Sequence, residues 1–394
     1  MPTELYLDTA RLGQISPTAK LESEVYLRIA ERESASSRFE SLLFADIANA
    51  AANSEFSTWR GVSDLKTRLQ RLASFPDDAN VLLAGRTKTL ARIVARLFFG
   101  PCRSLLVTDL GWPDYSDLLR TYAKRARRKL ACVELADAVF RDRATPEEVF
   151  GRIVDAYGRG GCDGLFLTAV SNTGITLDVS RIVTGLESMF DIKFIGIDGA
   201  QHLGHLPQSL AACSDFYFAG THKWLGSHLP LAVAFYGRRR SKNYVLATLR
   251  RLLDRDEIDD PLLRMTLDER SDRVPFGETV NVAPLFAASG AVADAGHNGE
   301  IVLRDRRNNI EALMQVATES GWRPLRPHER FRSGILLAES SRYTNAEPSE
   351  LRCRLQKRGL AVTAYQKGIV RLSAPNKPLS SDEFGIVRNA LRSC

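Results

Sequence analysis

Two residues that could take part in catalysis, an acid and a lysine, follow neighbouring apolar runs in the middle of the chain. The run 194–197 ends at Asp198, and the run 215–219 leads four residues later to Lys223. Two short buried strands would each deliver one charged residue at a carboxyl end, the edge at which open α/β sheets bind ligands. An acid and a lysine in one dry cleft indicate an aldehyde cofactor with a protonated ring nitrogen. The lysine would form a Schiff base, and the carboxylate would hold the ring proton.

Each of these two residues also has an ordinary interpretation. A lysine is normally a solvated surface residue, but Lys223 follows an apolar strand and lies between His222 and Trp224. Desolvation there would lower its pKa and favour the neutral amine that attacks an aldehyde. Asp198 could cap a following helix, yet its strand is too apolar to accept a carboxylate that has no partner.

The hydrophobic pattern predicts the elements that position these residues. From about residue 80, short apolar runs alternate with segments of helical periodicity, as in strands buried on both faces and covered by helices. The predicted strands are 81–84, 105–108, 130–134, 164–168, 193–197, 215–219 and 231–236. The sequence therefore predicts an α/β fold with a mainly parallel seven-stranded sheet and helices on both of its faces.

Length and pattern together predict the domain organisation. A chain of 394 residues exceeds the size of about 250–300 residues at which single cores stop growing. We expect a helical segment at 1–75 that packs on the small domain or a dimer interface, a large cofactor-binding domain at 76–290, and a small α+β domain at 291–394.

Within these domains the sequence predicts some elements more fully than others. Residues 245–290 are charged and predict irregular structure, followed by a long helix from about 294. Ser380 and Glu383 form a capping box for the last helix. The predicted elements of the small domain are strands at 333–338, 360–365 and 368–373 and helices at 348–358 and 381–392.

Composition is that of an ordinary globular protein, with 44% hydrophobic and 26% charged residues. No uninterrupted run of about 18 apolar residues exists, so we expect no membrane span. The first residues lack a basic stretch followed by an apolar one, so no secretory signal is expected. The six cysteines form no CxxC pair and indicate free thiols in a reducing compartment, by default the cytoplasm.

The net charge of +7 includes two basic clusters, at 124–129 and 238–240. Such clusters can bind nucleic acid, but here no aromatic residues are interleaved with them and no nucleic-acid module accompanies them. We interpret them as a solvated helix end and a loop after a strand, and we expect no nucleic-acid partner.

The sequence motif D-x-A-Q … D-F … H-K-W, which begins at Asp198, resembles that of the class V aminotransferases among the fold-type I pyridoxal phosphate (PLP) enzymes. The resemblance implies that Lys223 forms the Schiff base with PLP and moves a proton between the substrate Cα and the cofactor C4′. It implies that Asp198 pairs with the pyridine nitrogen and that Gln201 hydrogen-bonds the phenolic oxygen. Thr221 and His222 would lie beside the cofactor, and no metal is implied.

Three further positions match the family. The turn Gly85-Arg86-Thr87 closes the first sheet strand and would hold the cofactor phosphate at a helix N-terminus. Trp112 would stack on the cofactor ring, and Asn172 would lie beside the phenolic oxygen. Helix capping, core packing and turn formation would explain the same residue types equally well.

Two more segments carry implications for assembly and substrate. Thr279, in the segment 276–281, resembles the family threonine that reaches the phosphate of the neighbouring subunit, which implies a homodimer with a shared active site. Arg371, in the segment 370–373, resembles the arginine that holds the α-carboxylate of a small amino-acid substrate through a bidentate contact.

The reaction itself stays open at this stage. The segment 360–368 has no cysteine where desulfurases carry their nucleophile, and Cys353 looks structural, which argues against persulfide chemistry. We expect a PLP-dependent enzyme that acts at Cα or Cβ of an amino acid, nominally an aminotransferase, with a C–S β-lyase or an epimerase as alternatives. A non-catalytic binding or regulatory relative is the alternative of another class, against which the joint presence of the acid, the lysine and Arg371 argues. His202, His205 and His228 fit no pattern.

Overall fold

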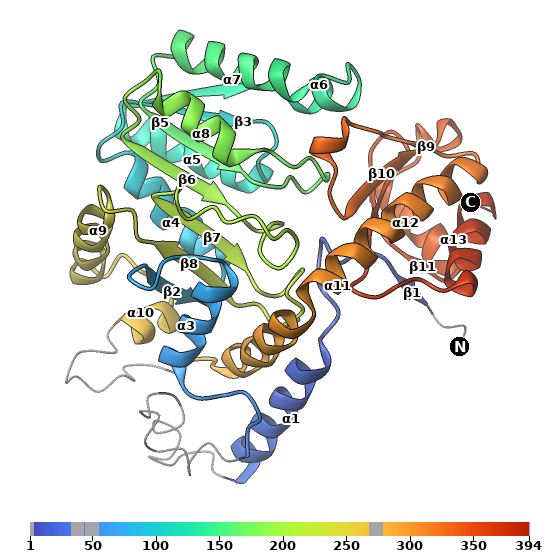
Figure 1. Cartoon of the computed structure of the whole chain (residues 1–394), viewed down its shortest axis with the longest axis horizontal. Helices are drawn as coiled ribbons and strands as arrows, with labels where there is room; N and C mark the ends of the chain where they lie inside the picture. The colour runs from blue at the N-terminus through green and yellow to red at the C-terminus, as the bar shows by residue number, and fades with distance from the viewer. Residues whose placement is uncertain (1–3, 33–42, 44–54, 268–278, 394) are drawn as a thin grey trace.

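The computed structural model describes residues 4–32, 43, 55–267 and 279–393. Figure 1 shows a large body built around a twisted sheet and a smaller body that contains the C-terminus. The long helix α11 (Ala283–Glu319) runs from one to the other. The N-terminal segment also passes between them, so both bodies contain residues from distant parts of the chain.

The large body contains the seven-stranded sheet that the sequence predicts. Its strands are β2 (Asn80–Ala84), β3 (Ser104–Thr108), β4 (Lys129–Val133), β5 (Gly164–Thr168), β6 (Phe194–Asp198), β7 (Phe216–Gly220) and β8 (Ala232–Tyr236). They lie in the order β2-β8-β7-β6-β5-β3-β4, and all pairs are parallel except the two made by β8. The carboxyl ends of six strands therefore meet at one edge of the sheet, which confirms the predicted fold class.

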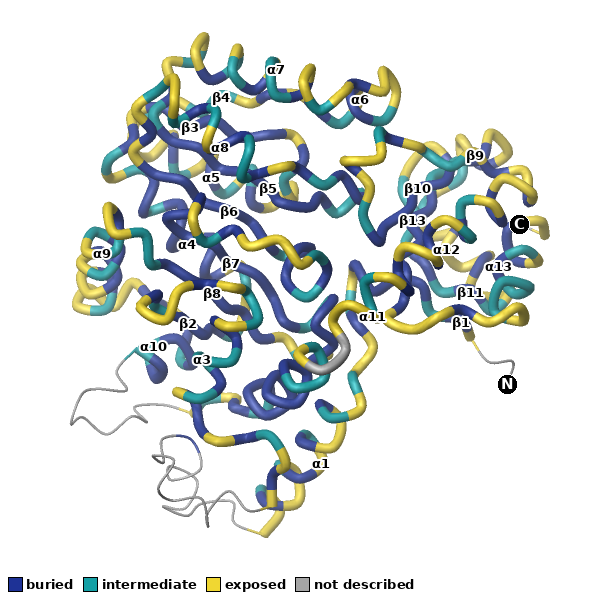
Figure 2. The backbone as a smooth tube through the Cα atoms, viewed as in Figure 1, coloured by how far each residue is buried: buried dark blue, intermediate teal, exposed yellow. Residues whose placement is uncertain are grey.

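Helices cover both faces of this sheet, because successive side chains of its strands are buried in two different cores. Ile195 and Ile197 lie in one core and Phe194 in the other; Tyr217 and Phe218 divide in the same way. Figure 2 shows the strands as the most continuously buried part of the chain. The helices of the large body are α3 (Val62–Leu72), α4 (Thr87–Phe98), α5 (Pro113–Ala126), α6 (Ala136–Phe140), α7 (Pro146–Arg159), α8 (Val179–Glu187), α9 (Lys242–Asp254) and α10 (Pro261–Leu267).

The small body has its own core and two small sheets. Strands β12, β13, β10 and β9 form an antiparallel sheet, and β1, near the N-terminus, pairs in parallel with β11. The predicted capping box of the last helix is confirmed, since Ser380 and Glu383 exchange both hydrogen bonds. The bounds are β1 (Leu5–Tyr6), β9 (Arg323–Pro324), β10 (Ile335–Glu339), β11 (Leu360–Ala361), β12 (Thr363–Tyr365), β13 (Ile369–Ser373), α12 (Pro348–Lys357) and α13 (Ser381–Ser393).

The prediction of irregular structure for residues 245–290 is wrong in the described parts of that segment. It contains most of α9 and all of α10, and α11 begins at Ala283 rather than near 294. The first turns of α11 are buried all round, with Leu285, Phe286 and Ala287 inaccessible to solvent, so they show no amphipathic period. This helix crosses the predicted boundary at 290. Helix α1 (Pro17–Arg32) packs against it.

Candidate active site

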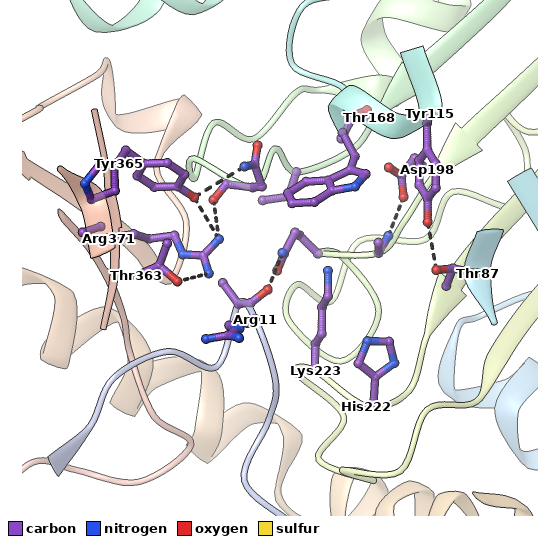
Figure 3. Close-up of a pocket in the computed structure, with 18 of the residues that line it drawn as sticks. Arg11, Thr87, Tyr115, Thr168, Asp198, His222, Lys223, Thr363, Tyr365 and Arg371 are labelled. Carbon is purple, nitrogen blue, oxygen red and sulfur yellow. Dashed lines mark hydrogen bonds between the residues drawn. The ribbon is translucent and has the colours of Figure 1, made fainter. Parts of the chain in front are cut away.

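A cavity of about 640 Å³ lies at the carboxyl edge of the large sheet, and part of its wall comes from α12, β12 and β13 of the small body (Figure 3). The carboxyl ends of β2, β3, β5, β6 and β7, or the turns that follow them, each contribute at least one side chain. The lining residues are Ala10, Arg11, Thr87, Trp112, Tyr115, Thr168, Val170, Asn172, Asp198, Ala200, Gln201, His222, Lys223, Pro348, Ser349, Arg352, Thr363, Ala364, Tyr365 and Arg371.

Asp198 is the last residue of β6 and lies between Thr168 of β5 and Phe218 of β7 in the strand register. Its Oδ1 accepts one hydrogen bond, from the backbone N–H of Ala200 at 2.9 Å. Burial raises the pKa of Asp198 to about 6, with Lys223 acting in the opposite direction. Among the described residues no cation lies within ion-pair distance of Asp198. Its carboxylate can therefore accept a hydrogen bond from the protonated ring nitrogen of a ligand.

Lys223 lies in the turn that follows β7. Burial lowers its pKa to about 8; Asp198 counteracts this shift, and Arg371 adds to it. The turn is held from both sides, since Gly226 N–H donates to the Lys223 carbonyl at 3.1 Å and Gly13 N–H donates to the preceding carbonyl at 2.8 Å. An added Cβ at Gly13 would collide with the Lys223 carbonyl oxygen, so the chain approaches this turn as closely as a glycine allows.

Thr221, which we predicted to lie beside the cofactor, does not line the cavity. Its hydroxyl is buried and lies 2.8 Å from the Ser227 hydroxyl and 3.2 Å from the Leu231 carbonyl. The side chain closes the loop that carries Lys223, so it positions the lysine from outside. His222 does line the cavity, and burial lowers its pKa to about 4, which keeps the imidazole neutral.

Of the three residues in the predicted phosphate-binding turn, Gly85-Arg86-Thr87, only Thr87 lines the cavity. Thr87 is the first residue of α4, and its hydroxyl accepts a hydrogen bond from Tyr115 at 2.8 Å. Gly85 and Arg86 do not line the cavity, and Arg86 is exposed. The N–H of Gly85 donates to both oxygens of buried Asp260 at 3.1 Å, so this amide is already engaged by protein.

Gln201 lines the cavity, but both ends of its amide contact protein. Its Nε2 donates to the Ala10 carbonyl at 2.7 Å, and its Oε1 accepts from the Trp224 indole at 2.6 Å. Gln201 therefore ties the N-terminal segment to the lysine turn. Trp112 lines the cavity with 46% of its surface exposed, so it is a wall rather than a core residue.

Arg371 is buried, with only 4% of its side chain exposed, and forms an ion pair with Asp8 at 2.8 Å. Its two terminal nitrogens also donate to the Asn172 carbonyl, the Tyr365 hydroxyl and the Thr363 hydroxyl. Its Nε is buried without a described partner. A bidentate grip on a substrate carboxylate, as predicted, would have to share these nitrogens with Asp8. The amide of Asn172 donates to Tyr365 at 3.4 Å.

Thr279 is exposed and does not line the cavity, and the preceding residues 276–278 of its motif lie outside the described residues.

The three unexplained histidines make protein contacts: His202 with the Tyr217 hydroxyl, His205 with the Gln201 carbonyl, and His228 with the Gly13 carbonyl. These contacts assign them packing roles.

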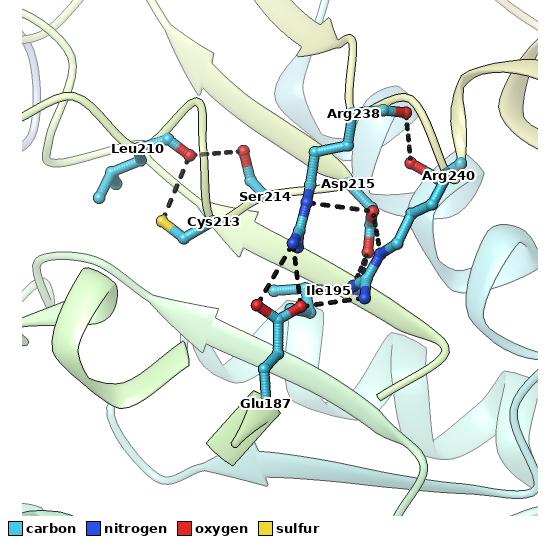
Figure 4. Close-up of polar contacts among 9 residues, drawn as sticks. Glu187, Ile195, Leu210, Cys213, Ser214, Asp215, Arg238 and Arg240 are labelled. Atoms are coloured by element: carbon cyan, nitrogen blue, oxygen red, sulfur yellow. Dashed lines mark hydrogen bonds and ion pairs between the residues drawn. The ribbon is translucent and has the colours of Figure 1, made fainter. Parts of the chain in front are cut away.

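Asp215, the acid of the D-F motif, directly precedes β7, at the end of that strand opposite to the cavity. Figure 4 shows its polar contacts. It is fully buried, accepts from the Ile195 N–H at 2.8 Å and pairs with Arg240 at 2.8 Å. Arg238 pairs with Glu187 at 2.9 Å. Two of the three arginines in the second basic cluster are therefore engaged in ion pairs that fasten β6 and β7 to the loop after β8.

Several cavity residues were not predicted from the sequence. Asp8, which does not itself line the cavity but pairs with Arg371, follows an apolar run, the same signal that singled out Asp198, and could have been found in this way. Arg11, Tyr115 and Arg352 carried no local signal, because only the fold brings them to the cavity, whereas Thr168 ends a predicted strand and could have been found from that position. Tyr365 lay in a predicted strand whose side chains could not be assigned to a face.

The cavity fits a planar, anionic, pyridine-containing ligand such as PLP. The Thr168 hydroxyl and His222 Nδ1 line it and are buried without hydrogen-bond partners among the described residues. Such orphaned groups are normally satisfied by a ligand or water. Among the same residues, no three His, Cys, Asp or Glu side chains are grouped to hold a metal ion, and no helix has the length and hydropathy of a membrane span.

No protein-family model matches the sequence, and no curated protein matches it either. Solved structures match over nearly all of the chain. A NifS-like protein has 14% identity and a TM-score of 0.70, covering 99% of both chains. An alanine–glyoxylate aminotransferase from Nostoc sp. has 15% identity and a TM-score of 0.70, covering 100% of this chain and 95% of its own.

A C-DES variant with glycine covalently linked to its PLP cofactor has 13% identity and a TM-score of 0.71, covering 99% of this chain and 97% of its own. At such identities the similarity establishes the fold. The chain therefore has the fold of the fold-type I PLP enzymes, which is the fold that its sequence predicts.

Proposed function

We propose that the protein is a PLP-dependent enzyme that acts on a small amino acid, nominally as an aminotransferase. The observation that carries this proposal is the placement of buried Asp198 and partly buried Lys223 in one cavity at the carboxyl edge of the sheet. Burial raises the pKa of Asp198 and lowers the pKa of Lys223, so that each group favours its neutral form. This suits a nucleophilic amine and a carboxylate that needs a cationic partner.

When bound, PLP supplies an electron sink for a carbanion at the substrate Cα. Asp198 would accept the ring N–H, and Trp112 would cover the ring. Thr87 and the N-terminus of α4 would hold the phosphate. The Nζ of Lys223, neutral in part near pH 7, would take and return the Cα proton.

The bond that breaks is not determined by these residues, so elimination at Cβ and epimerisation are the alternatives within this proposal. A desulfurase is disfavoured, because none of the described lining residues is a cysteine and Cys353 is exposed on α12. A parallel screen of amino acids for keto acid, for pyruvate with ammonia, and for loss of chirality separates the three reactions.

We further propose a homodimer with a shared active site, located in the cytoplasm. Thr279 is exposed outside its own cavity, where it is free to reach a neighbouring subunit. The five described cysteines are free thiols, which fits a reducing compartment.

The decisive experiment is borohydride reduction of the purified, PLP-loaded protein, followed by peptide mapping. We expect the label on Lys223, and we expect Lys223→Ala to lose at least about 10²–10⁴-fold in turnover while it still binds PLP through the other contacts. Lys88→Ala is the matched control, since Lys88 is exposed beside Thr87 and pairs with Asp114. A label elsewhere, or normal turnover in Lys223→Ala, would contradict the proposal.

A further inference from the structure

The part of the cavity formed with the small body carries more positive charge than the proposed chemistry uses. Four basic side chains line the described cavity, namely Arg11, Lys223, Arg352 and Arg371, whereas Asp198 is its one acidic lining residue. In Figure 3, Arg371, Thr363 and Tyr365 lie together on one side and Asp198 and Thr87 on the other. Three of the four basic side chains come from elements other than the large sheet and its loops: Arg11 from the N-terminal segment, Arg352 from α12 and Arg371 from β13.

Arg371 does not supply that excess, because a buried carboxylate already neutralises it. Asp8 is 2.8 Å from the guanidinium, and both of its oxygens also accept from the Thr363 hydroxyl, at 2.9 and 2.8 Å. This engagement also leaves Asp8 with little capacity for a second cation. The unneutralised charges at this end are therefore those of Arg11 and Arg352.

Arg11 is held at the cavity by a well-anchored turn. The Tyr6 hydroxyl donates to the Leu12 carbonyl at 2.8 Å, and the Gln201 amide donates to the Ala10 carbonyl at 2.7 Å. The N–H of Arg11 donates to the Asp8 carbonyl at 2.8 Å. The backbone of Arg11 is therefore fixed on both sides, while its exposed side chain has no carboxylate partner among the described residues.

Arg352 reaches the same region from the first turns of α12, whose N-terminal residues Pro348 and Ser349 also line the cavity. The neighbouring acid Glu350 pairs with Arg354 on the same helix at 2.6 Å, and no described carboxylate lies within ion-pair distance of Arg352. Arg11, Arg371 and Arg352 all lower the pKa of Tyr6, against the larger effects of burial and of Asp8.

We propose that Arg11 and Arg352 form a subsite for a second oxyanion, carried on the side chain of the amino-acid substrate. Two guanidinium groups that have no carboxylate partner among the described residues and that line the same cavity as the already neutralised Arg371 match a carboxylate or a phosphate through paired N–H donors. The proposal rests on the amino-acid chemistry proposed above and names its substrate class: dicarboxylic amino acids, or amino acids with a phosphorylated side chain.

Calorimetry on the PLP-loaded protein with unreactive ligands tests this subsite without turnover. Glutarate and succinate should bind about 4- to 25-fold more tightly than butyrate. Arg11→Gln with Arg352→Gln should remove that preference, because each exposed charged contact contributes a factor of about two to five. The control is Arg358→Gln, which removes the same charge from the exposed end of α12 outside the cavity.

Steady-state kinetics then identify the oxyanion. A higher kcat/KM for glutamate or aspartate than for glutamine or alanine indicates a carboxylate, and a higher value for O-phosphoserine indicates a phosphate. Equal binding of glutarate and butyrate, or an equal loss in Arg358→Gln, would overturn the subsite. If borohydride labels Lys223 and the dicarboxylate preference is absent, the subsite alone is wrong; if Lys223 is not labelled, the proposed function fails whichever ligands bind.

Discussion

At the scale of the residue, burial determines the pH range in which Lys223 can act. Because its pKa is lowered to about 8, roughly a tenth of the protein carries the neutral amine at pH 7, far more than for an exposed lysine. We expect the rate at which the PLP-free protein captures the aldehyde to rise with pH and to level off above about pH 8. Stopped-flow absorbance measures this rate.

The affinity of the protein for PLP at acid pH reports on Asp198. Its pKa is raised to about 6, so it is mostly ionised at pH 7 and becomes protonated below about pH 6. Protonation removes the partner of the ring nitrogen, and the affinity for PLP should fall there. A capture rate that keeps rising through pH 10, as for a solvated lysine, would show that Lys223 is not desolvated in solution.

The sequence predicts cavity residues well where the signal is a strand end. Asp198, Lys223 and Asn172 follow strands whose carboxyl ends the parallel topology brings together. The same signal predicted Gly85 at the cofactor site, but Gly85 does not line the cavity, and its amide is engaged by Asp260, 175 positions away in the sequence. No local pattern carries information about such a contact.

At the scale of the element, the buried pair between Asp8 and Arg371 fastens the segment after β1 to β13. Asp8→Ala would leave a buried guanidinium without its counterion, and we expect a loss of about 3–5 kcal/mol in the free energy of unfolding. Denaturant titration measures it. The control Asp137→Ala removes an exposed pair with Arg141 and should cost at most about 1 kcal/mol.

A double variant separates the charge from the packing. Removing both partners, in Asp8→Ala with Arg371→Met, should recover part of the loss, because no uncompensated charge then stays buried. If the single variant Asp8→Ala is as stable as Asp137→Ala, the pair contributes nothing to the docking of the N-terminal segment.

The elements themselves could be predicted to different extents. The seven sheet strands have continuous apolar runs and were all found. Helix α9 was missed because its many charged residues hide the buried stripe of Val245, Leu249 and Leu252, and the start of α11 because it is buried all round. Periodicity is informative only when one face meets water.

At the scale of the whole molecule, one buried arginine of α11 joins the two bodies. The Arg306 guanidinium donates to the carbonyls of Gly204 at 2.7 Å and Trp224 at 3.2 Å in the large body, and to Asn376 Oδ1 at 2.6 Å in the small body. It lies 4.9 Å from the Trp224 ring centroid, next to the turn that carries Lys223. The described residues provide it with no carboxylate partner, so neutral acceptors alone hold it.

Arg306→Ala would leave several buried acceptors without donors, each at a cost of about 1–3 kcal/mol, and we expect a total loss of at least about 3 kcal/mol. Because these acceptors belong to both bodies, differential scanning calorimetry should also show the unfolding transition broaden or divide in two. Arg307→Ala is the control, since Arg307 is the exposed neighbour on the same helix. Identical thermograms for the two variants would mean that the bodies are coupled by the apolar packing along α11, and that the arginine serves only the lysine turn.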